Sequence, residues 1–559
     1  MKSIFTLLAS FIITLNSIAQ LNYAELHNIN ISEISPRIKT SILGESSTGI
    51  VAYQTNKEEN SISIGVLDSE DNFLSIKKEM LHDDSVENVF LRGSKVLVFT
   101  SNLNHLNGQE FKKNEVAPKV SVTLREVNLG TKKTKLSRNL AQYDYVNNAT
   151  YYEGQLRIEE SENEKFIGVC YGFVRGYSKP KKFKSYITLF NSNLEALNNI
   201  TWQSDRALQE AKRYEQIIVS NTGEIYIMTL SNFSKKMNAI YPIYTEIVMK
   251  NRTYENELPG LTKSDTRRQF HSSNHVSINI VDEDSKTPKT YDIDFEKKLQ
   301  YVAYNGCKMK LDADGNLVLA GLFSDAFNNF NSKGIFIAKI NSSSNQMEIV
   351  YQEYFTEQFV DEILPNEKLK ESAKTKFQKG KNPHINNVSI TNIIAHKNDE
   401  FSVLMEYENY DIGNTKFADF DKKNKSYTGN LQLLKFTESG SKLDWSLPFT
   451  KMYYLYMPKE VIGSNRSYIQ YFPSSNSLVL MYNEQNSNQT PKPSSLLGIE
   501  IDYPKLVMYE ISNSGELSEK QELLNNTDNI IKPEKSIKVG NRFILQGTHK
   551  DIQKFFELK

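Results

Sequence analysis

The hydrophobic positions of this chain form short apolar runs that polar turns separate. In the segment from Leu311 to Ile340, the runs Leu317 to Leu322 and Ile335 to Ile340 follow stretches rich in Asp, Asn, Ser and Gly. Runs of this length between such turns are typical of β-strands. Because two paired strands alone bury too little surface to be stable, the segment predicts a hairpin that belongs to a repeated, stacked unit.

Similar hairpins recur along the whole sequence. An apolar strand follows a polar turn near Ile50, Val96, Phe166, Ile225, Leu317, Phe401, Leu478 and Phe543. A second kind of polar turn alternates with the first and reverses the chain, as at residues 67–74, 190–197 and 511–517. This alternation indicates units of about four antiparallel strands, and such units predict an all-β fold. We expect a β-propeller of four-stranded antiparallel blades, eight in number with seven as the alternative. Two smaller propellers, or a propeller with a β-sandwich, are the competing arrangements.

The two ends of the chain can complete one such unit. After the apolar runs 543–546 and 553–558 the sequence ends before a further strand, and residues 21–31 offer an unpartnered one. We therefore expect residues 20–559 to form a single propeller domain whose termini close one blade, with insertions at 231–275, 356–381 and 483–501.

The insertion at 356–381 has a helical pattern. Pro365 should end a first helix, and Asn366 can cap a second helix that continues through Phe377. The apolar face of the first helix consists of Phe359, Val360, Ile363 and Leu364. The basic end of this insertion, from Lys374 to Lys381, could meet an acidic partner, although a solvated helix face is the simpler interpretation.

The first residues have the pattern of a secretory signal peptide. Lys2 supplies a basic start, Ile4 to Leu15 an apolar core and Ser17 to Ala19 a small-x-small cleavage site, so residues 1–19 would be removed. No later stretch approaches the ~18 consecutive apolar residues of a membrane-spanning helix. We therefore expect an exported protein that is periplasmic, on the outer surface or secreted, without a transmembrane helix.

The charge balance narrows the possible partners. Lys and Arg total 67, Asp and Glu also total 67, and the net charge is zero. Because nucleic-acid-binding domains usually carry a basic face, this balance disfavours nucleic acid as a partner.

The C-terminal third shows a further pattern. The stretch N-I-I-A-H-K-N-D-E-F-S-V-L-M-E-Y-E from Asn392, the stretch G-N-L-Q-L-L-K-F-T-E-S-G-S-K-L-D-W-S-L-P-F from Gly429, M-P-K-E-V from Met457 and S-L-V-L-M-Y-N-E from Ser477 resemble a large group of exported bacterial proteins of unassigned function. The likeness covers mainly residues 354–524. Since those proteins are propeller-like, the resemblance implies the same fold for this chain and adds nothing about its function.

One turn has part of a calcium-binding pattern. Asp312, Asp314 and Asn316 have the alternate oxygen spacing of a calcium loop. A full loop needs further ligands and a final bidentate carboxylate, but here an apolar strand begins at Leu317. We therefore interpret these residues as a hairpin turn.

A group of carboxylates could provide an acid and a base. Asp282, Glu283 and Asp284 precede Asp292 and Asp294, but the last two alternate in Y-D-I-D-F, as solvent-facing strand residues do. The sequence also lacks a nucleophile elbow, a phosphate-binding loop and a dinucleotide fingerprint. It therefore offers no candidate catalytic residue.

The histidines and cysteines are also weak candidates. His271 and His275 have the separation of helical metal ligands without a helical context, so we expect neither a metal nor a cofactor. Cys170 and Cys307 lie far apart in strand-like segments, where buried thiols are the preferred interpretation and a disulfide is the alternative.

The candidate binding residues are Tyr453, Tyr454 and Tyr456, in the segment K-M-Y-Y-L-Y-M. Tyrosine provides rigid amphipathic surface for sugars or peptides; the alternative interpretation is that these aromatic residues fill the space between blades. The sequence favours a monomeric, non-catalytic binding or scaffold protein with an extracellular or envelope protein or glycan as partner. The alternative is a carbohydrate-active hydrolase or lyase with carboxylates at the propeller mouth.

Overall fold

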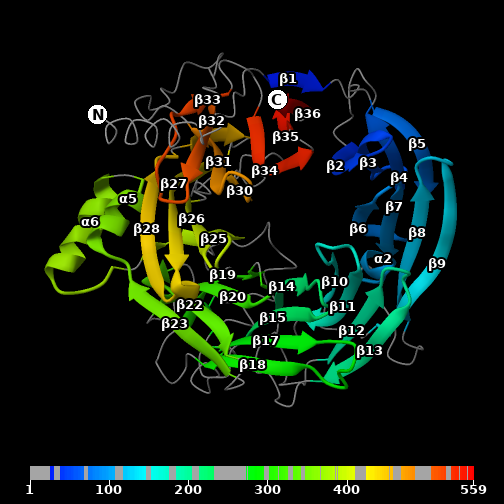
Figure 1. Cartoon of the computed structure of the whole chain (residues 1–559), viewed down its shortest axis with the longest axis horizontal. Helices are drawn as coiled ribbons and strands as arrows, with labels where there is room; N and C mark the ends of the chain where they lie inside the picture. Colours follow the sequence, from blue (N-terminus) through cyan, green and yellow to red (C-terminus); the bar gives the residue numbers. More distant parts are fainter. Residues whose placement is uncertain are drawn as a thin grey trace, which may run out of the picture.

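Antiparallel sheets surround a central axis in the computed structural model of the chain (Figure 1). The structure describes residues 26–29, 38–67, 73–107, 118–145, 153–174, 184–203, 213–231, 272–273, 275–294, 301–312, 314–324, 331–341, 346–365, 367–383, 385–386, 388–409, 424–451, 453–457, 467–484, 505–523, 530–539, 542–549 and 552–558. Within them, eight sheets of four or more strands form the blades. The fold is therefore an eight-bladed β-propeller, which confirms the fold predicted from the strand pattern and excludes the seven-bladed alternative.

In each of the first four blades the strands follow one another from the axis outward (Figure 1). Blade 1 contains β2 (Ile38–Ser46), β3 (Gly49–Asn56), β4 (Ser61–Leu67) and β5 (Phe73–Met80). Blade 2 contains β6 (Ser85–Arg92), β7 (Lys95–Ser101), β8 (Lys119–Asn128) and β9 (Lys133–Asp144). Blade 3 contains β10 (Glu153–Glu160), β11 (Phe166–Val174), β12 (Lys184–Asn191) and β13 (Ala196–Gln203). Blade 4 contains β14 (Arg213–Val219), β15 (Ile225–Ser231), β17 (His275–Val281) and β18 (Lys289–Asp294).

The next three blades follow the same order, with two additions. Blade 5 contains β19 (Tyr301–Leu311), β20 (Leu317–Ser324), β22 (Gly334–Asn341) and β23 (Gln346–Tyr354), and β16 (Ser272–Ser273) pairs with β19. Blade 6 contains β25 (Val388–Ala395), β26 (Phe401–Asn409), β27 (Asn424–Thr437) and β28 (Lys442–Phe449), and β29 (Tyr453–Met457) pairs with β27. Blade 7 contains β30 (Tyr468–Phe472), β31 (Ser477–Glu484), β32 (Lys505–Ser512) and β33 (Gln521–Glu522).

The eighth blade joins the two ends of the described chain. Its strands are β34 (Ile530–Val539), β35 (Arg542–His549) and β36 (Ile552–Leu558), followed by β1 (Leu26–Ile29) on the outer edge. In the register of this pairing, Leu26 lies opposite Leu558 and Ile29 opposite Phe555. The N-terminal strand thus supplies the fourth strand that the C-terminal sequence lacks.

The second strand of each blade is buried on both faces, because it packs against the blades before and after its own. In β3, Ile50 belongs to a hydrophobic cluster that includes Ile544 of blade 8. The next residue, Val51, points to the other face and belongs to a cluster that includes Val96 of blade 2. Similar shared clusters join the other neighbouring blades. This double burial explains why these strands appear in the sequence as continuous apolar runs.

Irregular pairing is frequent between the two innermost strands of a blade. Register shifts interrupt the pairing of the first and second strands in six of the eight blades. In β6 the shift lies between Val86 and Asn88, so Glu87 has no opposite residue in β7. Since a bulge increases local twist and redirects side chains, these positions can aim side chains differently from the regular strand.

The helical insertion lies between blades 5 and 6. Helix α5 (Glu357–Ile363) begins after Thr356, whose Oγ1 accepts a hydrogen bond from the Phe359 amide at 3.1 Å, and α6 (Glu367–Gln378) follows. This confirms the predicted pair of helices, while the proposed cap Asn366 lies outside the described residues. A short helix α2 (Leu103–Asn107) follows β7, a 3₁₀ turn (Glu438–Gly440) precedes β28, and β21 (Asn331–Ser332) pairs with β24 (Ile385–Asn386). None of the described helices has the length and hydropathy needed to traverse a lipid bilayer.

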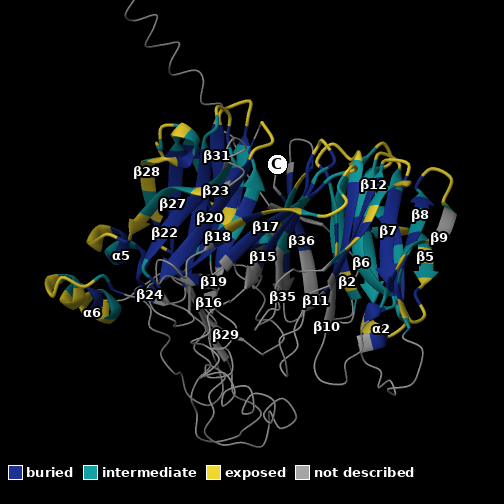
Figure 2. Ribbon diagram, turned by 90° about the horizontal axis from the view of Figure 1, so that it is seen from below, coloured by how far each residue is buried: buried dark blue, intermediate teal, exposed yellow. Residues whose placement is uncertain are grey.

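The two faces of the ring differ in their connections. Antiparallel alternation places the turns between first and second strands, and between third and fourth strands, on one face, which we call the short-turn face. The connections between second and third strands, and those between blades, leave from the other face, which we call the long-connection face. In Figure 2, exposed turns border the upper edge, while α2 and α6 lie toward the opposite edge.

Candidate functional site

The predicted binding tyrosines occupy the added strand β29. In its pairing with β27, Tyr453 lies opposite Thr428, Tyr454 opposite Tyr427 and Tyr456 opposite Lys425. Residues 424–428 form the start of β27, the third strand of blade 6, so this pairing places β29 at the long-connection face. The side chains of these tyrosines lie outside the described part of the structure, so their role as a binding surface stays a prediction.

The Asp312 turn is held by its own side chain. One oxygen of Asp312 accepts hydrogen bonds from the amides of Asp314 at 3.0 Å and Asn316 at 2.7 Å, and the other accepts one from Asn316 Nδ2 at 3.2 Å. Lys339 Nζ lies 3.9 Å from the same carboxylate, which is almost fully buried. These bonds agree with the interpretation of this segment as a hairpin turn.

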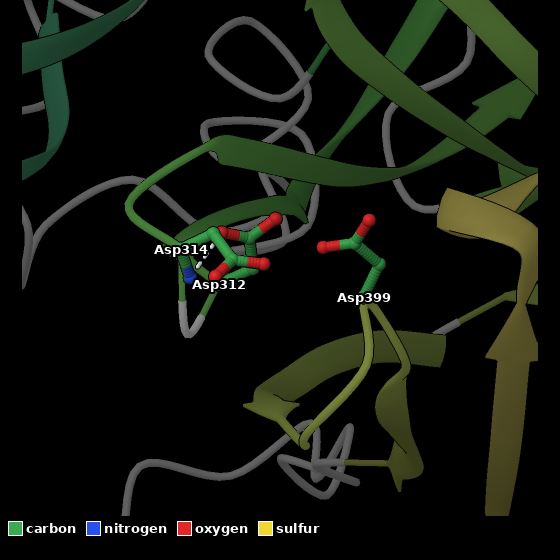
Figure 3. Close-up of side chains that lie close together, drawn as sticks. All are labelled: Asp312, Asp314 and Asp399. Carbon is green, nitrogen blue, oxygen red and sulfur yellow. Dashed lines mark hydrogen bonds between the residues drawn. The ribbon is translucent and has the colours of Figure 1, made fainter.

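A third carboxylate comes from the neighbouring blade. Asp399, in the turn between β25 and β26, faces Asp312 and Asp314 (Figure 3), and one ligand atom from each of the three lies within 4.8 Å of the others. A hydrogen bond and the negative charge of Asp399 raise the pKa of Asp314. Such a group can share a proton or attract a hard cation, which would need more oxygen ligands than these three. The sequence identified both turns, but only the packing of blade 6 on blade 5 brings them together.

Two further carboxylates lie on the first strands of blades 2 and 3. Glu87 accepts hydrogen bonds from Ser101 Oγ at 2.5 Å and Ser85 Oγ at 3.1 Å, and burial raises its pKa. On β10, burial also raises the pKa of Glu159, while the positive charge of Arg157 lowers it.

A direct contact places these two strands side by side. Asn88 Nδ2 donates a hydrogen bond to the Ile158 carbonyl at 2.8 Å, so the neighbours of Glu87 and Glu159 touch. The charge of Arg157 acts on both carboxylates, and Arg157 itself is exposed. The sequence reasoning missed this group, because neither strand has a motif that distinguishes these residues from other polar strand positions.

The acidic stretch that the sequence did identify has a structural role. In the turn between β17 and β18, Asp282 Oδ1 accepts hydrogen bonds from Ser285 Oγ at 2.6 Å and from the Asp284 amide at 3.1 Å. Asp292 lies on the outermost strand of blade 4 and is exposed, whereas the side chain of Asp294 is outside the described residues. These carboxylates therefore lie far from the inner strands of the ring.

Other sequence candidates lie in strands or outside the described structure. His275 begins β17, while His271 falls outside the described residues. Cys170 and Cys307 are both buried, in blades 3 and 5, and no disulfide joins these two described residues. Burial raises the pKa of Cys170 far above that of an ordinary thiol.

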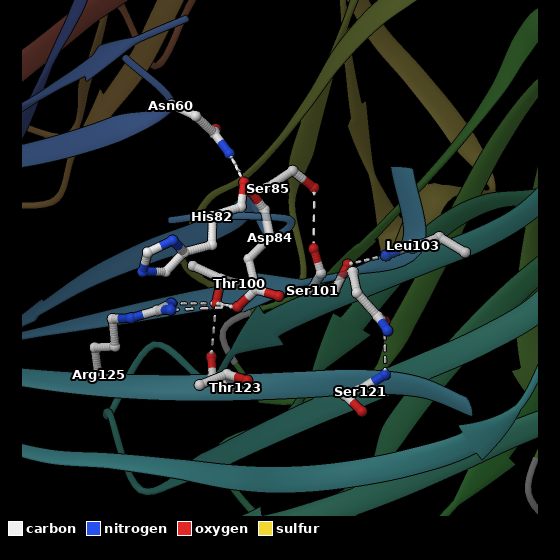
Figure 4. A network of polar contacts seen from close by, with 11 residues as sticks. Asn60, His82, Asp84, Ser85, Thr100, Ser101, Leu103, Ser121, Thr123 and Arg125 are labelled. Carbon is white, nitrogen blue, oxygen red and sulfur yellow. Dashed lines mark hydrogen bonds and ion pairs between the residues drawn. The ribbon is translucent and has the colours of Figure 1, made fainter. Parts of the chain in front are cut away.

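A polar network joins blades 1 and 2 (Figure 4). Asp84 Oδ2 accepts a hydrogen bond from Thr100 Oγ1 at 2.8 Å and forms an ion pair with Arg125 at 3.3 Å. The side-chain amide of Asn60, in the turn between β3 and β4, donates hydrogen bonds to the carbonyls of His82 and Asp84. These contacts fix the segment that connects blade 1 to blade 2, so the network has a structural role.

Two buried lysines lie at the contact between blades 6 and 7. Lys451 Nζ lies 3.1 Å from Glu406 Oε2, and the two side chains are 0% and 1% exposed. Glu406 Oε1 also accepts a hydrogen bond from the Ser467 amide at 2.8 Å. Lys435 Nζ lies 3.0 Å from Glu400 Oε2 and donates hydrogen bonds to the backbone carbonyl and to Oδ1 of Asn513, both at 2.9 Å.

A buried histidine lies beside the second lysine. His396 Nε2 is 3.0 Å from Ser402 Oγ, and its ring stacks on Tyr471 with centroids 4.7 Å apart. Burial, together with the charge of Lys435, lowers the pKa of His396 to about 4. It is therefore neutral near pH 7, and its ring packs between blade 6 and Tyr471 of blade 7.

The ring of eight four-stranded blades defines the chain as a β-propeller, and this assignment rests on its strand pairing. The sequence matches no protein-family model and no curated protein.

Among solved structures, the chain is similar to the WD40 domain of SCAP from fission yeast (9% identity, 96% of this chain and 97% of that chain covered, TM-score 0.38). It is also similar to the Dos1 propeller (10% identity, 97% and 96% covered, TM-score 0.39) and to the polysaccharide lyase Uly1 (10% identity, 84% and 89% covered, TM-score 0.36). These similarities are too distant to indicate a function for this chain.

Proposed function

We propose that this protein is an exported, non-catalytic propeller that binds an extracellular or cell-envelope partner through its long-connection face. The observation that carries the proposal is the difference between the two faces. The connections 232–271, 355–387 and 485–504 all leave from the long-connection face, as the strands that they join require. Long connections in a compact domain commonly have a binding role, because a stable fold does not need their length.

The short-turn face has a different character, since its turns are closed by their own side chains. Ser220, Asp312 and Ser512 each accept a hydrogen bond from the amide four residues later, at 2.9, 2.7 and 3.0 Å. Asn191, in blade 3, accepts the same bond from the Glu195 amide at 3.0 Å. These polar side chains are engaged within their own turns and are therefore less available to a partner. This supports the long-connection face as the binding face.

The proposed export is compatible with the architecture of blade 8. Cleavage after Ala19 would leave the whole closing strand β1, which begins at Leu26, in the mature chain. Mass spectrometry of the protein secreted by its producing cells should identify Gln20 as the N-terminal residue. An intact Met1 on the mature protein would contradict this part of the proposal.

The binding proposal can be tested by shortening one connection. Glu484 and Lys505 lie opposite each other at the end of the β31–β32 pair, so a four-residue Gly-Ser linker can replace residues 485–504 without stretching the blade. The matched control inserts the same linker after Thr131, on the short-turn face. The assay measures saturable binding of the labelled mature chain to washed envelopes of the producing cells, with unlabelled variants as competitors.

We expect the short-turn variant to compete like the unaltered chain and the 485–504 variant to compete at least tenfold more weakly. Equal competition by both variants, or no saturable binding, would contradict the proposal. Both variants should keep the β-rich circular dichroism spectrum of the unaltered chain.

The second candidate function is a carbohydrate-active hydrolase or lyase. It is favoured by Glu87 and Glu159, because half-buried carboxylates with raised pKa values on inner strands can act as general acids. However, the Glu87 carboxylate already accepts two serine hydroxyls. Release of reducing ends or of unsaturated uronates from polysaccharides, abolished by Glu87→Gln or Glu159→Gln, would establish this candidate and overturn the non-catalytic one.

A further inference from the structure

Helix α6 presents one side to the propeller and the other to solvent. Leu369, Ala373 and Phe377 recur at helical spacing and pack against the apolar cluster that α5 forms with blades 5 and 6. The helix extends outward from the ring beside β28 (Figure 1) and lies toward the long-connection face (Figure 2). Its packing therefore determines which residues face outward.

The outward side is rich in lysine. Residues 367–381 contain six Lys and two Glu, a local net charge of 6 − 2 = +4 in a chain whose total charge is zero. Two of these lysines have acidic partners, since Lys370 contacts Glu367 at 3.4 Å and Lys374 contacts Asp361 at 3.1 Å.

The other four lysines are exposed and form no ion pair with another described residue. We call this group the lysine surface; it consists of Lys368, Lys376, Lys379 and Lys381. From Lys368 to Lys379 it extends roughly 16 Å along the helix, at about 1.5 Å per residue.

The lysine surface is held on a firm support. Asn430 Nδ2, on β27, donates a hydrogen bond to the Glu362 carbonyl at 2.7 Å, and Gln432 Nε2 donates one to Glu362 Oε2 at 3.0 Å. The ion pair between Lys374 and Asp361 then joins α6 to α5. A ligand would thus meet positive charges whose backbone is already ordered, which lowers the entropic cost of binding.

We propose that the lysine surface binds a linear acidic polysaccharide, a partner class that rests on the binding function proposed above. Charge complementarity requires an anionic partner. A helix that binds within a membrane interface needs an outward apolar face, whereas the apolar residues of α6 are turned toward the propeller. A folded protein partner would usually need apolar anchor residues, and none of the large exposed hydrophobic residues among the described ones lies on this helix.

Lysine suits such a polymer for a chemical reason. Its ammonium is a compact, strongly hydrated point charge on a flexible stem, so it can follow carboxylates or sulfates that recur along a chain without a fixed geometry. Several exposed contacts of this kind add up along the polymer, and salt weakens them.

The test compares two fourfold variants with the same change in charge. The first replaces the lysine surface by glutamine, as Lys368→Gln, Lys376→Gln, Lys379→Gln and Lys381→Gln. The control variant makes the same change at four exposed lysines on the short-turn face: Lys132, Lys133, Lys165 and Lys286. The mature full-length chain is titrated with polygalacturonate oligomers, which carry a carboxylate on every sugar, at low and at physiological salt.

We expect the unaltered chain and the control variant to bind alike, the lysine-surface variant to bind roughly thirtyfold more weakly, and added salt to reduce the difference. Absence of binding by the unaltered chain, or equal loss in both variants, would overturn the proposal. Tighter binding to phosphatidylserine vesicles or to polyglutamate at equal anion concentration would overturn the assignment of a polysaccharide. Envelope binding that depends on 485–504 but not on the lysines would refute this inference alone and leave the proposed function in place.

Discussion

The buried pair of Lys451 and Glu406 allows a quantitative test of the packing between blades 6 and 7. Its charged atoms are 3.1 Å apart and the side chains are 0% and 1% exposed, so Lys451→Met would leave the Glu406 carboxylate buried without its counter-charge. Loss of one partner of a buried ion pair costs about 3–5 kcal/mol in free energy of unfolding. The Ser467 amide remains as a donor to Glu406, which places the expected loss near the lower end, at about 3 kcal/mol.

A double-mutant cycle separates the interaction energy of the ion pair from the effects of changing the size and shape of each side chain. Urea unfolding followed by far-ultraviolet circular dichroism should show that Glu406→Leu is also strongly destabilising. The double variant should recover most of the combined loss, because it leaves no unpaired buried charge.

The exposed pair of Lys442 and Glu438 in the same blade provides the control. These side chains are 62% and 65% exposed and 3.5 Å apart, so Lys442→Met should cost less than about 1 kcal/mol. If Lys451→Met costs no more than Lys442→Met, or if the two substitutions at the buried pair are additive, the reasoning is refuted.

Three further outcomes are expected. Gly321→Ala should lower stability by about 1–3 kcal/mol, because the added Cβ would lie 2.1 Å from the ring of Phe336; an unchanged urea midpoint would contradict this. Cys170 and Cys307 should react with a thiol reagent only after unfolding, since both are buried; rapid labelling of the native protein would show otherwise. Burial raises the pKa of Glu87, so its ionisation penalises the fold above the folded-state pKa, and this penalty disappears as the pH falls toward the unfolded-state pKa. Stability measured from pH 7 to pH 4 should therefore rise less, or fall more, in Glu87→Gln than in the unaltered protein.

The strand plan of the propeller follows from local patterns. The strand starts predicted near Phe166, Ile225, Leu317 and Phe401 coincide with the first residues of β11, β15, β20 and β26. This agreement arises because double burial produces a continuous apolar run and because Asp, Asn, Ser and Gly form the turns that bound it. The helices at 357–363 and 367–378 were also predictable from local signals, namely the apolar spacing and Pro365.

The site candidates depend on which blades become neighbours. Asp399 meets Asp314, although 85 residues separate them in sequence, because blade 6 packs on blade 5. In the same way, Glu87 meets the strand of Glu159 through the contact of Asn88 with Ile158. No periodicity within a single strand indicates such a pairing.

The sequence by itself determined the class of fold, the repeat of strands and turns, and the place of the helical insertion. These features depend on contacts between residues close in the chain. Only the tertiary structure decided that the ring has eight blades and that α6 turns its lysines to solvent. Both results depend on how whole sheets and helices pack against one another, and that packing sums many long-range contacts that no local pattern encodes.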